Sequence, residues 1–188
     1  MTDIIVYNKF SENLKLHWDE ISECTYLSIF QKWNWLTSWY ENIGKKENII
    51  LFIFVIINKN KTVGILPLCL YRKFMIKIFS FVGSTQNDYN DIILTKEGND
   101  ILSSSNMWIE IVQKFPKHDL FTLNKISNID HYSGLNDFTN INIKKNNNAY
   151  YSDLPSTEDE YFNNLNKKVK AATRRQYNRL IAKGTLDF

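Results

Sequence analysis

Two apolar runs joined by a short polar turn constrain the fold of this chain more than any other feature. Residues 49–57 read IILFIFVII, residues 62–72 read TVGILPLCLYR, and Asn-Lys-Asn-Lys separates them. Runs rich in β-branched and aromatic residues on either side of turn-forming residues predict an antiparallel β-hairpin. The first run has about half of the roughly 20 residues that a helix needs to cross a bilayer, so we interpret it as a core strand.

The neighbouring patterns predict an α+β domain. Helical spacing of aromatic residues over 27–43 indicates an amphipathic helix, with Trp35 and Trp39 in the core and Gly44 at a left-handed C-cap. The patterns that follow the hairpin predict, in chain order, a strand over 76–82, a short strand over 92–94, a helix over 98–115 and a strand over 119–123. This order is typical of a mostly antiparallel mixed sheet flanked by helices.

The remainder of the chain is more polar. Its patterns predict, in chain order, an irregular connection over 124–148 with one short strand near Ile141, a strand over 149–154, a helix of roughly 25 residues from Thr157 onward, and the first residues of another strand over 185–188. Thr157 and Glu160 fit a capping box at the start of the helix. We therefore expect a first domain over 1–150 and the opening of a second over 151–188.

Charge and cysteine content narrow the class of protein. The 188 residues carry a formal net charge of +3, and seven Lys/Arg fall within residues 165–188. Cys24 and Cys69 are far apart, in no CxxC motif and without a neighbouring His, so we expect two reduced thiols, with Cys69 buried, and no metal site. The N-terminus shows no basic segment followed by an apolar one, which predicts a cytoplasmic protein with no transmembrane segment.

Four stretches, taken in order, resemble a known family. They are FQKWNWLTSWYEN, KTVGILPLCL, FSFVGSTQNDYNDIIL and YYSDLPSTEDEYFNNLNKKVKAATRRQYNRLIAKGTLDF. With these stretches the chain resembles the BioF2-like or CelD-like acetyltransferases, which are GNAT-related proteins akin to the Fem aminoacyltransferases that modify cell-wall peptides. The resemblance extends over nearly all of the chain.

The resemblance implies two GNAT-like lobes and transfer of an acyl group from acetyl-CoA or another acyl-CoA to an amine. The acceptor would be a small molecule or a cell-envelope sugar or peptide precursor. In that family the second lobe holds the acyl thioester, and a Gly-rich loop at a helix N-terminus binds the pyrophosphate. This sequence has no R/Q-x-x-G-x-G/A stretch, and its six glycines are far apart.

We therefore expect the chain to be an N-terminal GNAT-like lobe followed by a long helix that begins a second, missing lobe. Such a chain would be inactive alone, would not bind acyl-CoA alone, and would need a separately encoded C-terminal lobe as its partner. A frameshifted gene product without a role is a further hypothesis.

Candidate catalytic residues lie in the loop that leads to the strand at 92–94. Asp88, Tyr89 and Asp91 match the family's D-Y motif, and a carboxylate beside a phenol can act as base and acid when an amine attacks a thioester. The alternative interpretation is that these polar residues only cap the turn into the strand.

Candidate anion-binding residues lie in the basic helix. Lys168, Arg174, Arg175 and Arg179 match basic positions of the family and have the chemistry to bind phosphate, an anionic glycan or RNA. An ordinary solvated helix face is the alternative. A second hypothesis for the chain is accordingly a non-catalytic module that binds RNA or an anionic polymer through residues 165–183. The three histidines, His17, His118 and His131, fit no catalytic motif, and we expect them at surface or incidental positions.

Overall fold

The computed structural model describes residues 2–103, 105–138, 142, 144 and 153–184. The chain divides into two compact units, Met1–Lys144 and Lys145–Phe188, called unit 1 and unit 2 below. Among the described residues, unit 1 contains a six-stranded sheet with helices, and unit 2 contains two helices. Each unit is described by itself.

The sheet of unit 1 is mixed and mostly antiparallel. Its strands are β1 (Thr2–Tyr7), β2 (Ile50–Asn58), β3 (Lys61–Lys73), β4 (Ile76–Phe81), β5 (Ile93–Leu94) and β6 (Leu120–Thr122). The spatial order is β1-β2-β3-β4-β6, and β5 pairs with β3 beyond the end of β4. Only β4 and β6 pair in parallel among the described strands. The α+β class and the mostly antiparallel sheet flanked by helices, which the sequence predicts, are confirmed.

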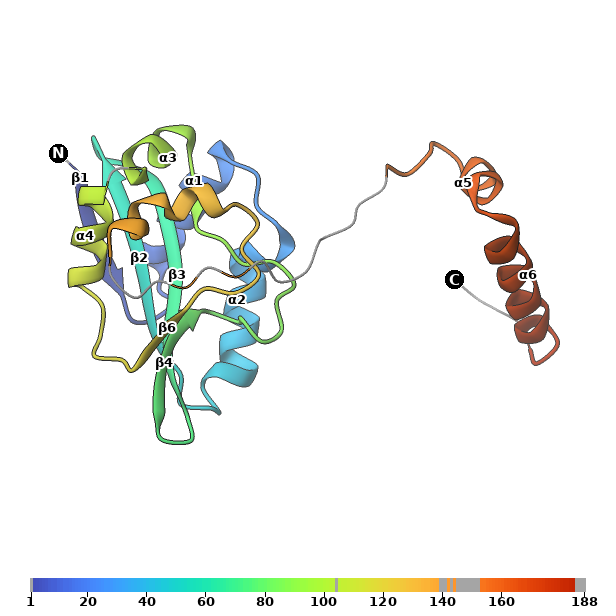
Figure 1. Cartoon of the computed structure of the whole chain (residues 1–188), viewed down its shortest axis with the longest axis horizontal. Coiled ribbons are helices and arrows are strands. Elements are labelled where there is room, and N and C mark those ends of the chain that lie inside the picture. Colours follow the sequence, from blue (N-terminus) through green and yellow to red (C-terminus); the bar gives the residue numbers. More distant parts are fainter. Residues whose placement is uncertain (1, 104, 139–141, 143, 145–152, 185–188) are drawn as a thin grey trace. The chain divides into compact units, whose positions relative to one another are not determined.

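Helices cover both faces of this sheet (Figure 1). They are α1 (Glu12–Cys24), the 3₁₀ turn η1 (Ile29–Gln31), α2 (Trp33–Trp39), the π turn η2 (Tyr40–Gly44), α3 (Lys96–Leu102), α4 (Ser105–Gln113) and the 3₁₀ segment η3 (Ile129–Asp137). α1 and α2 pack on the face that carries Ile53 and Val55, whereas α3, α4 and η3 pack on the face that carries Phe54 and Ile56. The alternation along β2 gives each face its own core because successive strand residues point to opposite sides.

The predicted hairpin is confirmed as the centre of the sheet. Asn58 pairs with Lys61, so the loop consists of Lys59 and Asn60, both with positive φ (49° and 61°). Two-residue loops of this kind match the twist of the strands that they join. β3 is buried from Thr62 to Cys69, and it pairs with β2, β4 and β5.

The predicted helix over 27–43 is divided in the structure. Lys32 is extended and separates η1 from α2, because the carbonyl of Gln31 accepts the indole N–H of Trp18 (3.0 Å). The expected left-handed C-cap at Gly44 is wrong, since the chain continues through a π turn in which the N–H of Lys45 donates to the carbonyl of Tyr40. The structure also adds β1 and α1, which the sequence patterns did not predict.

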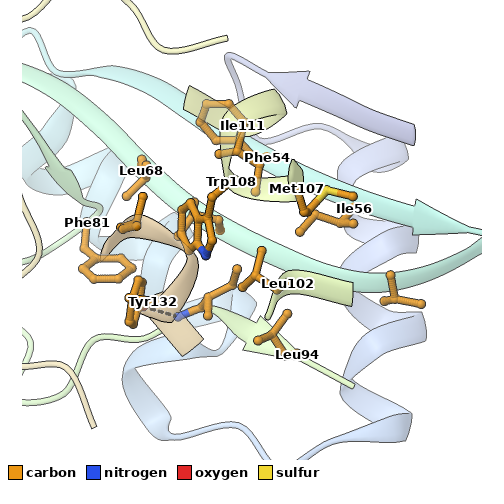
Figure 2. Packing of buried hydrophobic residues seen from close by; sticks show 14 of the residues in the cluster. Phe54, Ile56, Leu68, Phe81, Leu94, Leu102, Met107, Trp108, Ile111 and Tyr132 are labelled. Carbon is orange, nitrogen blue, oxygen red and sulfur yellow. Dashed lines mark hydrogen bonds between the residues drawn. The ribbon is translucent and has the colours of Figure 1, made fainter. Parts of the chain in front are cut away.

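The predicted helix over 98–115 is likewise two helices. α3 ends at Leu102 and α4 begins at Ser105. Serine competes for helical backbone groups, and the Ser103 hydroxyl donates to the carbonyl of Asn99 (2.8 Å). The irregular connection expected over 124–148 contains η3, which brings Tyr132 and Leu135 into the core, where Tyr132 lies beside Trp108 (Figure 2).

Unit 2 has α5 (Glu158–Asn164) and α6 (Lys167–Ile181) in place of the single helix of roughly 25 residues expected by pattern. Leu165 is extended (ψ 148°), and the Asn166 side chain caps α6 by accepting the N–H of Val169 (2.9 Å). The Thr157 N-cap is confirmed, because its hydroxyl accepts the N–H of Glu160. The strands expected near Ile141, over 149–154 and over 185–188 lie wholly or mostly outside the described residues.

Replacing Gly98 with Ala tests how tightly α3 sits against the sheet. A Cβ at Gly98 would lie 1.9 Å from the carbonyl oxygen of Val63 in β3, so the helix or the strand must shift. We expect Gly98→Ala to lower the free energy of unfolding by about 3 kcal/mol, as severe overpacking does. Urea denaturation measures the change, and Asp100→Ala, at an exposed position of α3, should stay within about 0.5 kcal/mol of the parent. Equal stabilities of the two variants would contradict the close contact.

Candidate active site

A pocket of about 280 Å³ opens between the segment that joins α1 to α2 and the loop that leads into β5. Its lining is Thr25, Tyr26, Ser28, Gln31, Tyr89, Asn90, Asp91, Ile92, Ile93, Leu94, Ser127 and His131. Ser28 is the N-cap of η1, where Ser28 and Gln31 form a capping box, and the backbone N–H of Ser28 donates to Gln31 Oε1 (3.0 Å).

Asp91 is the centre of the polar network beside the pocket. Its side chain is buried, and both carboxylate oxygens accept hydrogen bonds. The donors are the backbone N–H groups of Ile92 and Asn128, the hydroxyls of Ser127 and Tyr132, and Nδ1 of His131. A buried carboxylate is tolerated where donors surround it in this way. Four of these donors lie 36 to 41 residues away in sequence, so Asp91 joins two distant segments.

The hydrogen bonds of His131 define its tautomer. Asn128 accepts the N–H of Asp130 through Oδ1, so its amide nitrogen donates to Nε2 of His131 (3.1 Å). Nδ1 of His131 then carries the proton and donates to Asp91 Oδ1 (3.2 Å). A carboxylate on Nδ1–H leaves Nε2 as the basic nitrogen and orients the ring. The side chain of His131 is 19% exposed, so a ligand in the pocket can reach it.

Tyr132 supports this network from the core. Its hydroxyl donates to Asp91 Oδ1 (2.8 Å) and accepts the N–H of Ile92 (3.1 Å). Burial, followed by the nearby Asp91 charge, raises the pKa of the Tyr132 hydroxyl well above 10. The phenol therefore stays protonated at neutral pH and remains a donor to the carboxylate.

Two tryptophans fix the loop that carries Asp91. The indole N–H of Trp35 donates to Asn87 Oδ1 (2.8 Å), and that of Trp39 donates to Gln86 Oε1 (2.9 Å). The Asn87 amide in turn donates to Asn90 Oδ1 (2.9 Å). Trp39 is buried as predicted, and Trp35 is partly buried. The aromatic face of α2 therefore serves the core and also positions the loop.

The three catalytic candidates from the sequence have different surroundings. Asp91 and Tyr89 line the pocket, with the Tyr89 ring 6.2 Å from that of Phe30. Asp88 is exposed and does not line it. Asp91 also accepts the N–H of the next residue, Ile92, so the alternative interpretation as a turn cap describes part of its role.

The basic candidates belong to unit 2. Lys168, Arg174, Arg175 and Arg179 are all exposed on α6. The Arg174 guanidinium lies 5.4 Å from the centre of the Phe162 ring. Whether these side chains bind an anion stays a prediction.

Sequence reasoning missed His131, Ser127 and Tyr132. His131 stands alone in sequence and was expected at an incidental position, whereas the structure brings it to a buried carboxylate 40 residues earlier. No spacing rule signals such a pair, because the position of η3 depends on its packing against α4, where Tyr132 lies beside Trp108. His17 contacts the Thr62 hydroxyl (2.7 Å) and His118 contacts the carbonyl of Pro116 (2.7 Å), so neither belongs to the pocket.

Several backbone N–H groups that could meet a pyrophosphate after β4 already have partners within the protein. The N–H groups of Ser84, Gln86 and Asn87 already donate to the carbonyls of Phe81 and Gly83. At the start of α3 the N–H of Gly98 donates to the Thr95 hydroxyl, and the backbone there packs against Val63. A phosphate cradle needs free N–H groups at a helix start, and these groups are occupied.

Comparisons with known proteins give structural likenesses only. No family model and no curated protein matches the chain. A GNAT family acetyltransferase from Staphylococcus aureus aligns with 81% of this chain and 98% of its own, at 15% identity and a TM-score of 0.39. An acetyltransferase from Trypanosoma brucei aligns with 82% and 100%, at 12% identity and a TM-score of 0.41.

Glucosamine-6-phosphate N-acetyltransferase from Arabidopsis thaliana aligns with 81% of this chain and 99% of its own, at 12% identity and a TM-score of 0.42. Likenesses with TM-scores below 0.5 do not establish a shared activity. Within the described part of the chain, no group of three or more His, Cys, Asp or Glu is placed to hold a metal ion. Among the same residues no helix is long and apolar enough to cross a bilayer.

Replacing Asp91 or Asp88 with asparagine compares the contribution of the buried carboxylate to stability with that of the exposed one. We expect Asp91→Asn to lower the free energy of unfolding by about 3 kcal/mol, since an amide cannot accept all of these donors and several lose a charged partner. We expect Asp88→Asn to change it by less than about 0.5 kcal/mol, as at most exposed sites. Urea denaturation measures both. Long-range ¹H–¹⁵N NMR should find the Nδ1–H tautomer of His131 in the parent and in Asp88→Asn, and an Nε2–H tautomer in the parent would contradict the arrangement.

Proposed function

We propose that unit 1 is a GNAT-like lobe that holds the amine acceptor of an N-acyl transfer reaction. The acceptor binds in the pocket beside Asp91 and His131. The pairing of His131 Nδ1 with the buried Asp91 carboxylate at 3.2 Å is the observation that carries this proposal. The order of helices and strands and the sequence resemblance to GNAT-related acyltransferases support the reaction class.

His131 has the arrangement of a general base. Its Nδ1 donates to Asp91. In the proposed complex, the amine nitrogen of the acceptor takes the place of the Asn128 amide at Nε2. An amine must lose a proton to become the nucleophile in acyl transfer, and the unprotonated Nε2 of an imidazole can take that proton. Asp91 stabilises the imidazolium that results and keeps the ring in place.

The pocket suits a small acceptor group with polar atoms. Its volume of about 280 Å³ is at the lower end of ligand sites. Its lining includes the polar side chains of Gln31 and Ser127, and it also includes Tyr26 and Tyr89, which are 91% and 43% exposed. An amino sugar or the amino end of a peptide has this combination of polar and apolar groups.

The acyl donor is held outside unit 1 in this proposal. The occupied N–H groups of Ser84, Gln86 and Asn87 support this separation, because they are not available to bind a pyrophosphate. A second GNAT-like lobe, in the same protein or in a partner chain, would supply the donor site. Acetyl-CoA or another acyl-CoA is the cosubstrate that the sequence resemblance implies.

Binding of an anionic polymer by α6 is a second candidate function. The helix exposes Lys168, Arg174, Arg175 and Arg179, and no acidic residue occurs within its bounds. Clustered cations of this kind bind phosphate backbones by releasing counterions. This function would be independent of the pocket in unit 1.

NMR titration of the whole chain with glucosamine and with an alanyl peptide amide tests the acceptor site. We expect one of these amines to shift the amide signals of Tyr89, Asp91 and His131, with affinity that falls as pH rises through the pKa of the amine, because the ammonium form is the stronger donor to Nε2. His131→Gln should reduce this pH dependence and keep the fold. Asp88→Asn is the matched control and should bind like the parent. Shifts that avoid the pocket for both amines would contradict the proposal.

Calorimetry tests where the donor is held. We expect acetyl-CoA to show no stoichiometric binding to the chain alone, because the N–H groups of Ser84, Gln86 and Asn87 are not available to bind a pyrophosphate. Stoichiometric binding would show that the donor site lies within this chain and would contradict the separation of the two sites. That result would not contradict the acceptor site, which the amine titration tests separately.

Salt dependence tests the second candidate. If α6 binds a phosphate backbone, affinity for single-stranded oligouridine should fall steeply as salt rises. Changing Arg174, Arg175 and Arg179 to Ala should lower the slope of log affinity against log salt by about 0.7 for each phosphate that the helix no longer neutralises. Filter binding or fluorescence anisotropy measures both, and a flat salt response would exclude this function.

A further inference from the structure

The hairpin between β3 and β4 ends in an apolar tip surrounded by cations. Lys73 pairs with Ile76, so Phe74 and Met75 form the two-residue loop. Their side chains are 91% and 87% exposed, and the neighbouring Ile76 is 48% exposed. The hairpin extends from one end of the sheet of unit 1 (Figure 1). Turns at such positions normally carry Gly, Asn or Asp, whose conformations and solvation suit a loop.

Phe74 occupies a backbone conformation that its side chain disfavours. Its φ is +56°, in the left-handed region, where the first loop position of such hairpins usually holds glycine or asparagine. A bulky residue with positive φ is strained, and strain of this kind is retained at sites of function more than elsewhere. Here the strain places an aromatic side chain in solvent, where folding gains nothing from it.

Cations flank the tip on both strands. Arg72 and Lys73 precede it, and Lys77 follows it. Arg72 and Lys73 are exposed, and Lys77 is partly buried. A carboxylate also lies here, because Asp119 Oδ2 accepts the backbone N–H of Lys77 (2.8 Å). The three cations and this one carboxylate give the end of the hairpin a net positive charge.

The convex shape of the tip favours a lipid bilayer over another protein as its partner. A stable interface between proteins buries about 800 Å² on each side, and two side chains at a convex point supply far less. A convex apolar point with flanking cations suits a fluid surface that deforms around it and carries negative charge. In an anionic bilayer the apolar side chains enter the boundary between headgroups and acyl chains, and the cations meet lipid phosphates.

We propose that the β3–β4 hairpin tip attaches this protein peripherally to anionic lipid bilayers. Phe74 and Met75 insert at the headgroup boundary, and Arg72, Lys73 and Lys77 contact the anionic headgroups. The tip and the acceptor pocket lie on different elements, so failure of either proposal leaves the other standing.

Vesicle co-sedimentation of the whole chain tests this attachment. The two vesicle types are phosphatidylcholine alone and equal parts of phosphatidylcholine and phosphatidylglycerol. We expect binding to the second type only, with a partition coefficient that falls roughly tenfold in Phe74→Gly and again in Met75→Ser, because each loses a buried apolar side chain. Lys73→Gln should lower it about fivefold.

Phe74→Gly distinguishes loss of lipid binding from loss of folding. Glycine relieves the positive φ at this position, so the melting temperature should stay equal or rise while vesicle binding falls. Tyr26→Ser, which removes an equally exposed aromatic ring elsewhere in unit 1, is the matched control and should bind vesicles like the parent. All variants are compared with and without Arg174→Ala, Arg175→Ala and Arg179→Ala, because the exposed cations of α6 would also attract anionic lipid.

A fluorescent probe locates the contact. In a Cys24→Ser background, Met75→Cys or Tyr26→Cys is labelled with an environment-sensitive dye. Burial raises the pKa of the Cys69 thiol to about 12, so that thiol stays unlabelled. The probe at position 75 should shift to the blue with phosphatidylglycerol vesicles, and the probe at position 26 should not.

Two results would overturn the proposal. One is unchanged vesicle binding in Phe74→Gly together with no spectral shift at position 75, which would place any lipid contact elsewhere, such as on α6. The other is sedimentation velocity that finds a dimer without lipid, abolished by Phe74→Gly, which would assign the tip to a second copy of the chain.

Discussion

Strand β3 is the element on which the rest of unit 1 depends. It is buried from Thr62 to Cys69, and it pairs with β2, β4 and β5. Because both faces of this strand are apolar, each must be covered, and the two helical layers satisfy that requirement. The close approach of Gly98 to Val63 then fixes the height of α3 above the sheet.

A buried carboxylate is the second constraint, and it determines the site. A buried carboxylate needs hydrogen-bond donors, and the segment over 127–132 supplies them by lying against Asp91. The same contacts orient His131 at the pocket. Stability and chemistry thus depend on one network, in which the protonated Tyr132 serves the fold and His131 is available to a ligand.

The tip of the β3–β4 hairpin lowers the stability of the fold, whereas the network around Asp91 contributes to it. Phe74 and Met75 add nothing to the core and carry the cost of exposed apolar surface and of a strained backbone. Residues that local physics disfavours, with no compensating contact in the fold, are the ones for which an interaction outside the fold is the natural explanation. The polar groups around Asp91 thus satisfy one another within the fold, whereas the apolar surface at Phe74 is left to a partner outside it.

Sequence by itself determined the central hairpin, the α+β class, the buried Cys69 and the Thr157 cap, because these follow from the spacing of neighbouring residues. It also selected Asp91 and Tyr89, which line the pocket, together with Asp88, which does not. Only the structure decided the partners of Asp91, the tautomer of His131 and the breaks within the predicted helices at Lys32, which follows a long-range bond, and at Leu165, which precedes the local Asn166 cap. Those features depend on hydrogen bonds between residues far apart in the chain or on local competition for backbone groups, and hydrophobic periodicity records neither.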